Sequence, residues 1–326
     1  MNPELRLPKV VITHWVHDEV IRLLEQSCCV VPNIGRSTLP RDEVLRRCSD
    51  ADAVMVFMPD RVDEEFLSLC PRLKVIGAAL KGYDNFDVAA CERHDVRFSI
   101  VRDLLTEPTA ELAVALLLAM GRNLPPGDRM VRSGEFHGWR PVLYGKGLSG
   151  STVGIIGMGA IGRAVAKRLQ GFGCRLVYSD PLRLKPEVET GLGLALCHLG
   201  ELLSESDFVL VAAPLTPQTR HIINSETLGG MKTGAYLVNV GRGSVVDEAA
   251  VAEALGSNRL AGYAADVFEF EDWARADRPL GIHPDLLADH GKTVFTPHLG
   301  SAVDGVRREI ELETARSILS VLHGED

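Results

Sequence analysis

The chain has 326 residues, of which 46% are hydrophobic and 24% charged, with a formal net charge of −9 and a pI near 5.6. This length suits two domains, and the acidic balance argues against nucleic acid or an anionic membrane surface as the main partner. Seven scattered cysteines without a CxxC pair, ten scattered histidines, and the lack of a signal-peptide pattern or a membrane-length apolar run predict a cytoplasmic protein with reduced thiols and no metal site.

The first hundred residues alternate between strand-like and helix-like patterns, which is typical of a parallel α/β domain. Strands are predicted over residues 9–13, 53–58, 74–80 and 97–100. Helices are predicted between them, for example over residues 18–26 and 41–48. A long and strongly apolar helix follows over residues 109–120, and we expect it to be buried between domains or between subunits.

A glycine-rich motif in mid-chain is the most informative feature of the sequence. An apolar strand pattern at 153–156 leads into a glycine turn and then into a helical pattern at 163–170; the three glycines are Gly157, Gly159 and Gly162. In a dinucleotide-binding fold the first glycine permits the tight turn, the second lets the backbone approach a pyrophosphate, and the third allows close helix–strand packing. The N–H groups where the helix starts, around Ala160 and Ile161, would bind the phosphates.

An acidic residue stands at the expected distance beyond this motif. Asp180 follows a strand predicted over residues 175–178, which suits a carboxylate that binds the ribose hydroxyls. Such a carboxylate repels a 2′-phosphate, so the sequence predicts NAD rather than NADP as the cofactor. Arg183 and Lys185 lie close in the sequence and can weaken this preference.

The alternation continues to the end of the chain, with strands predicted over residues 208–213, 236–240, 260–264 and 293–295. A last helix, over residues 303–322, is expected to cross back to the first domain. The predicted fold is therefore α/β, with two Rossmann-like doubly wound parallel-sheet domains. The NAD-binding domain (105–301) is inserted within a substrate domain (1–104 and 302–326), and a substrate pocket is expected between them.

Three polar residues follow predicted strands of the nucleotide domain, namely Arg242, Glu271 and His298. Because the carboxyl ends of parallel strands line the ligand crevice, all three can meet there. A histidine with a nearby carboxylate forms a general acid–base pair, and the fork of an arginine suits an oxyanion. Each residue alone would more often be structural, but together they favour catalysis.

The runs 239–248, 265–271 and 296–301 carry a family resemblance. They are similar to the D-isomer-specific 2-hydroxyacid dehydrogenase family, and the similarity extends over almost the whole chain. The resemblance implies NAD-dependent hydride transfer, with Arg242, Glu271 and His298 as catalytic residues. It also implies that cofactor contacts are made by Asp266 at the nicotinamide amide and by Thr109, Pro214, Val240 and Gly241.

Four further runs resemble one branch of this family, the phosphonate (phosphite) dehydrogenases; they are 57–62, 80–87, 132–139 and 271–279. Ordinary members usually have proline after the catalytic glutamate, whereas Asp272 and Trp273 follow it here. The resemblance implies oxidation of phosphite to phosphate by a homodimer. It implies that Lys81, the backbone at Gly82 and Arg307 join Arg242 around the anion. The residues implied to line or close the pocket are Met58, Trp139, Tyr144 and Ser301.

Two other functions remain open on the sequence. The substrate can be a D-2-hydroxy acid such as glycerate or lactate, or glyoxylate or hydroxypyruvate in the reverse direction. In that reaction Arg242 would hold the carboxylate, and His298 with Glu271 would take the hydroxyl proton. A different class of function is a dinucleotide-sensing corepressor, which the intact set of three polar residues disfavours.

Overall fold

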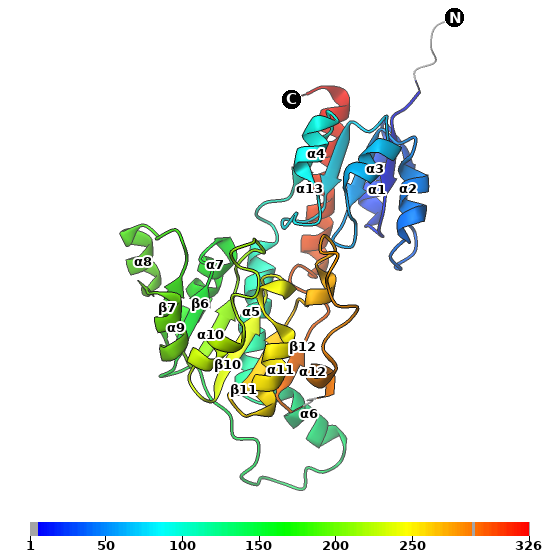
Figure 1. Cartoon of the computed structure of the whole chain (residues 1–326). Helices are drawn as coiled ribbons and strands as arrows, with labels where there is room; N and C mark the ends of the chain where they lie inside the picture. Colours follow the sequence, from blue (N-terminus) through cyan, green and yellow to red (C-terminus); the bar gives the residue numbers. More distant parts are fainter. Residues whose placement is uncertain (1–5, 289–290, 326) are drawn as a thin grey trace, which may run out of the picture. The chain divides into compact units, whose positions relative to one another are not determined.

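The computed structural model describes residues 6–288 and 291–325 (Figure 1). The chain forms two compact units. Unit 1 runs to Leu105, includes Trp273–Ala276 and resumes at Ala302, whereas unit 2 comprises Thr106–Asp272 and Asp277–Ser301. The excursion of residues 273–276 into unit 1 is not part of the sequence prediction.

Unit 1 is built on a parallel sheet of five strands in the order β2-β1-β3-β4-β5. The strands are β1 (Lys9–Ile12), β2 (Cys29–Val31), β3 (Ala53–Val56), β4 (Val75–Ala78) and β5 (Arg97–Ile100). Side chains of α1 (Asp18–Glu25) and α13 (Asp304–His323) join the core on one face. The other face is covered by α2 (Arg41–Cys48), α3 (Glu64–Leu69) and α4 (Val88–Arg93).

Unit 2 is built on a parallel sheet of seven strands in the order β12-β11-β10-β9-β6-β7-β8. The strands are β6 (Thr152–Ile156), β7 (Arg175–Ser179), β8 (Leu194–Leu196), β9 (Phe208–Val211), β10 (Ala235–Asn239), β11 (Leu260–Ala265) and β12 (Thr293–Phe295). The chain order reverses between β6 and β9, as in other doubly wound nucleotide-binding sheets. Both sheets are parallel and covered by helices on both faces, so the predicted fold class is confirmed.

The helices of unit 2 form two layers. One face of the sheet packs on α5 (Thr106–Gly121) and α7 (Ala160–Leu169). The other packs on α9 (Leu199–Glu205), α10 (Ser225–Gly230), α11 (Glu248–Gly256) and α12 (Pro284–Ala288). The remaining elements are α6 (Leu124–Arg132), α8 (Pro186–Leu192) and the short 3-10 helices η1 (Gln170–Phe172), η2 (Gly243–Val245) and η3 (Glu269–Glu271).

The apolar helix α5 packs largely within its own unit. It packs on α7, β10 and β11, so its own unit supplies its cover. Gly262 of β11 leaves the room, since a Cβ there would lie 2.4 Å from Sδ of Met120. Leu112, Val114 and Leu118 of α5 are only partly buried by these contacts, so burial of this helix against a second subunit stays a prediction.

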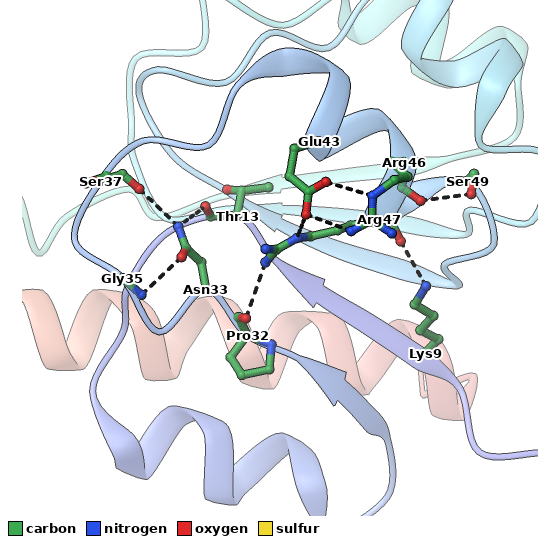
Figure 2. A network of polar contacts seen from close by, with 10 residues as sticks. All are labelled: Lys9, Thr13, Pro32, Asn33, Gly35, Ser37, Glu43, Arg46, Arg47 and Ser49. Atoms are coloured by element: carbon green, nitrogen blue, oxygen red, sulfur yellow. Dashed lines mark hydrogen bonds and ion pairs between the residues drawn. The ribbon is translucent and has the colours of Figure 1, made fainter.

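A polar network fixes the loop that follows the short edge strand β2 (Figure 2). The side-chain amide of Asn33 donates to the carbonyl of Thr13 (3.0 Å) and accepts from the N–H of Gly35 (3.1 Å). On α2, Glu43 accepts from Arg46 and Arg47, and these bonds lower the pKa of Glu43 to about 2. These polar contacts add to the apolar packing of Val30 and Val31 at this edge of the sheet.

Within the described ranges, no helix is both long enough and apolar enough to cross a membrane.

Candidate active site

The glycine turn after β6 has the geometry that a bound dinucleotide requires. Gly157 has a φ of +91°, and a Cβ there would lie 2.7 Å from the nitrogen of Ala213. A Cβ on Gly162 would lie 2.3 Å from the carbonyl oxygen of Gly157. By contrast, a Cβ on Gly159 would meet nothing within 4 Å. Gly157 and Gly162 thus allow close packing. The open space at Gly159 adjoins the start of α7, at Ala160 and Ile161, and suits a phosphate group.

Asp180 follows β7 and is held by two backbone donors. Its Oδ2 accepts from the N–H of Met158 (2.7 Å), and its Oδ1 accepts from the N–H of Leu182 (2.8 Å). The first bond ties the carboxylate to the glycine turn, because Met158 stands between the first two glycines. Arg183, which the sequence offered as a competing charge, forms an ion pair with Glu189 instead (3.0 Å).

Asp266 lies at the centre of a second cluster, after β11. Its side chain accepts from Oγ1 of Thr296 (2.6 Å) and from the N–H groups of Leu299 (2.6 Å) and Gly300 (2.8 Å). Burial raises the pKa of Asp266 even though these bonds lower it. A Cβ on Gly300 would lie 3.1 Å from Oγ1 of Thr109, so α5 also reaches this cluster.

His298 and Glu271 form a direct pair. Nδ1 of His298 lies 2.7 Å from Oε2 of Glu271, and the other carboxylate oxygen, Oε1, accepts from the N–H of Phe268 (3.0 Å). His298 has a left-handed φ of +55°, and its N–H donates to the carbonyls of Asp266 and Thr296 (3.0 Å each). These hydrogen bonds therefore fix the backbone of His298, while 30% of its side chain is exposed.

Arg242 follows β10 in a tightly packed loop. The side-chain amide of Asn239 donates to the carbonyl of Arg242 (2.9 Å) and accepts from the N–H of Gly241 (3.1 Å). A Cβ on Gly241 would lie 2.5 Å from the carbonyl oxygen of Ala213, which precedes Pro214 after β9. Buried Val240 completes the junction with β10.

The predicted residues of unit 2 thus collect mostly at one end of its sheet. The glycine turn, Pro214, Arg242, Asp266 and His298 follow the carboxyl ends of β6, β9, β10, β11 and β12. Ser301 is the last residue of unit 2 and adjoins Gly300. A backbone donor set, a histidine–carboxylate pair and a guanidinium at one sheet edge can bind a dinucleotide, an anion and a transferable proton.

Two predicted pocket residues of unit 2 belong to a segment that precedes the sheet. Trp139 and Tyr144 stand in the loop between α6 and β6, where 84% and 77% of their surface is exposed. Nearby Lys146 reaches Asp207 (2.7 Å), which directly precedes β9 and so marks the amino ends of the strands. The structure therefore does not bring Tyr144 to the carboxyl ends where Arg242 lies.

Unit 1 groups its predicted residues at the carboxyl ends of β3 and β4. Lys81 and Gly82 follow β4, and Nη1 of Arg307 on α13 donates to the carbonyl of Ala79 (3.3 Å). The guanidinium carbon of Arg307 lies 5.8 Å from the centre of the Phe57 ring, next to Met58. Burial lowers the pKa of Arg307, and the charge of Glu311 opposes that shift.

A buried acid that was not predicted as a site residue, Asp60, lies beside Phe57. Asp60 accepts from Oγ1 of Thr13 (2.6 Å) and from the N–H of Phe57 (2.7 Å), and burial raises its pKa. Nε2 of His14 lies 3.8 Å from Asp60, is buried without a hydrogen-bond partner in the described chain, and has a pKa lowered by burial. Both residues lie within a few positions of a strand's carboxyl end, that of β1 or β3, and this position could have marked them as site candidates.

No group of three or more His, Cys, Asp or Glu side chains in residues 6–288 and 291–325 could hold a metal ion.

Comparisons with known proteins agree with this geometry. Residues 114–300 match the family model described as D-isomer specific 2-hydroxyacid dehydrogenase, NAD binding domain. The chain is 38% identical to a glyoxylate reductase of Thermococcus onnurineus, over 98% of this chain and 94% of the relative. A crystal structure of a Thermus thermophilus protein superposes with a TM-score of 0.86 at 36% identity and 97% coverage of both chains. The D-lactate dehydrogenase of Aquifex aeolicus, solved with NAD and lactic acid, gives a TM-score of 0.81 at 26% identity, over 97% and 96% of the two chains.

Proposed function

Because the chain belongs to the D-isomer specific 2-hydroxyacid dehydrogenase family, we propose that it oxidises a small oxyanion with NAD and that this oxyanion is phosphite. The observation that carries the reaction type is the 2.7 Å contact between Nδ1 of His298 and Glu271. This contact leaves Nε2 of the ring to exchange a proton with a bound substrate, and the carboxylate fixes the orientation of the ring.

The residues of unit 2 fit the cofactor NAD. The space at Gly159 accommodates the pyrophosphate, and Asp180 accepts from the ribose hydroxyls while it repels a 2′-phosphate. The Asp266 cluster holds the backbone at Leu299 and Gly300, which fixes the loop that carries His298. NAD would accept the hydride, and the chain's own residues would bind the substrate and transfer the proton.

Phosphite oxidation replaces a P–H bond by a P–O bond. In the proposed reaction, water attacks phosphorus as the hydride leaves, and His298 takes the proton that the water loses. The product is phosphate, and Glu271 stabilises the protonated ring. Arg242 binds two phosphite oxygens and offsets the negative charge that develops on them.

The choice of phosphite is supported by the cations and by one run of sequence. Lys81 and Arg307 stand at one sheet end of unit 1, and we propose them as anion-binding residues. Two positive charges at one sheet end suit a dianion such as phosphite better than a carboxylate with a single charge. The run 271–279, with Asp272 directly after Glu271, also resembles the phosphite branch.

A second candidate is the reduction of glyoxylate, or of another 2-oxo acid, to the hydroxy acid. Its support comes from the relatives, because the one from Thermococcus onnurineus is named a glyoxylate reductase, as are those from Pyrococcus horikoshii and Pyrococcus furiosus. In this reaction Arg242 would bind the carboxylate and His298 would give its proton to the carbonyl oxygen. The names of the relatives favour this candidate over phosphite.

One assay separates the candidates. Purified protein with NAD is offered phosphite, D-glycerate, D-lactate or glycolate, and with NADH it is offered glyoxylate or hydroxypyruvate, while NADH absorbance is followed. We expect rapid NADH formation with phosphite and slow turnover with the organic acids. Turnover of the organic acids alone would refute phosphite oxidation and keep the family reaction. Binding of NAD without any turnover would instead support the sensing role.

A further inference from the structure

The carboxylate of Asp272 stands between two segments that each carry a proposed catalytic residue. Asp272 is 2% exposed, and its Oδ2 accepts from the N–H of Ser244 at 2.7 Å. Ser244 lies two residues after Arg242, and Asp272 directly follows Glu271. This short, buried hydrogen bond fixes the distance between the two segments.

The packing around this bond is unusually close. A Cβ on Gly243 would lie 1.9 Å from the carbonyl carbon of Phe268, so the η2 backbone rests directly on the start of η3. Farther along, the N–H of Glu248 donates to Glu269 (3.1 Å), and the N–H of Glu269 donates to Glu248 (2.9 Å). The Ser244–Asp272 bond thus lies within two residues of both Arg242 and Glu271.

The chain also changes unit at this point. Asp272 ends a segment of unit 2, and the next residues, Trp273–Ala276, belong to unit 1. There the N–H of Ala274 donates to the side chain of Asn85 (3.1 Å), whose amide donates to the carbonyl of Met58 (3.0 Å). Residues 273–276 thus have a partner in unit 1, whereas Asp272 is held within unit 2.

We propose that Asp272 is a positioning residue: its carboxylate holds Ser244 so that Arg242 keeps its place relative to the Glu271–His298 pair. This inference rests on the proposed function, and it assigns Asp272 no contact with substrate or cofactor. A misplacement of about 1 Å in such a constellation costs a factor on the order of 10² in rate.

The test compares Asp272→Ala, Asp272→Asn and a matched control, Asp207→Ala. Asp207 also accepts a backbone N–H, that of Thr152 (2.8 Å), but at the amino ends of the strands. We expect Asp272→Ala to lower kcat about 10–100-fold with unchanged NADH affinity. Asp272→Asn should restore most of the rate, because an amide oxygen still accepts from Ser244. Per folded molecule, Asp207→Ala should keep the wild-type kcat.

Hydrogen exchange supplies a readout that does not depend on turnover. In Asp272→Ala the amide of Ser244 should exchange faster than in wild type, and in Asp207→Ala it should not. Equal kcat in Asp272→Ala and wild type, equal losses in Asp272→Ala and Asp207→Ala, or no rescue by asparagine would each overturn the proposal. A wild-type protein inactive on every substrate would refute the proposed function, and unaltered exchange at Ser244 would refute the anchor separately.

Discussion

The two units each contain a histidine–carboxylate pair of the same length. In unit 2, Nδ1 of His298 lies 2.7 Å from Glu271, and in unit 1, Nδ1 of His17 lies 2.7 Å from Glu311. The surroundings differ. Side-chain exposure is 30% and 19% for the pair in unit 2, but 14% and 3% for the pair in unit 1.

The second ring nitrogen distinguishes the pairs further. Nε2 of His17 lies 3.4 Å from Asp304, and the N–H of His17 also donates to Glu311 (3.0 Å). His17 therefore joins the loop after β1 to two acids of α13, which is a structural role. His298 instead has a left-handed backbone conformation at a strand end, and one carboxylate, that of Glu271, contacts its Nδ1. Distance alone does not identify a catalytic pair; the position in the fold and the use of the second nitrogen do.

The largest expected difference between the pairs is in catalysis. His298→Asn should lower kcat/KM about 10²–10⁴-fold, the range for loss of a general acid–base group. His17→Gln should keep kcat, because it changes a structural contact and removes no proposed catalytic residue. Initial rates of NADH formation, corrected for the folded fraction by circular dichroism, provide the measurement. Similar losses in both variants would show that the comparison is mistaken.

The next effect is on stability, and it depends on pH. Burial alone would lower the pKa of His17, but the hydrogen bonds and charges of Glu311 and Asp304 outweigh it and raise that pKa above 6.5. The folded state therefore binds the proton more tightly than the unfolded state, and the resulting stabilisation is fully present below 6.5. It is lost as the pH rises through the raised pKa of the folded state.

Urea unfolding of wild type and His17→Gln at two pH values checks this sign. Near pH 5.5 the wild type should be more stable by about 1.5–3 kcal/mol, the range for a hydrogen bond to a charged group. As the pH rises through the raised pKa of His17 the difference should shrink, since the ring loses its charge there. A difference that grows with pH would contradict the charge assignment.

The sequence predicted the parts of the molecule that have periodic or local signals. The β-branched strands and the turn at Gly157 follow from patterns within about twenty residues, and the structure has them within a few residues of the predicted bounds. The strands β2 and β8, of three residues each, were not predicted, although the equally short β12 was. The surroundings of His17 and Asp60 arise from contacts across dozens to hundreds of residues, which no local pattern encodes.

The proposed site divides in the same way. The positions of Arg242 and His298 after strands are local, so the parallel-sheet rule was enough to place them at one edge. Asp272 binds Ser244, which is 28 residues away in the sequence. The sequence showed only that Asp272 stands where proline is usual. The location of Tyr144 near the amino ends of the strands depends on the path of a loop, which periodicity does not specify.

A third histidine–carboxylate pair, also in unit 1, should have the smallest effect on stability. His94 and Glu64 have the shortest contact of the three, 2.6 Å between Nε2 and Oε1, but their side chains are 29% and 58% exposed. Solvent screens such a pair, and holding two side chains together costs conformational entropy. We therefore expect His94→Gln to leave the unfolding midpoint unchanged within error at either pH.

This variant also serves as the control for His17→Gln, because both remove one histidine from unit 1. If setting rather than distance decides the effect, the shortest pair has the smallest consequence, the buried pair an intermediate one, and the pair at the strand ends the largest. A destabilisation by His94→Gln equal to that of His17→Gln would mean that exposure does not separate them. The role of His298 would then have to rest on kinetics alone.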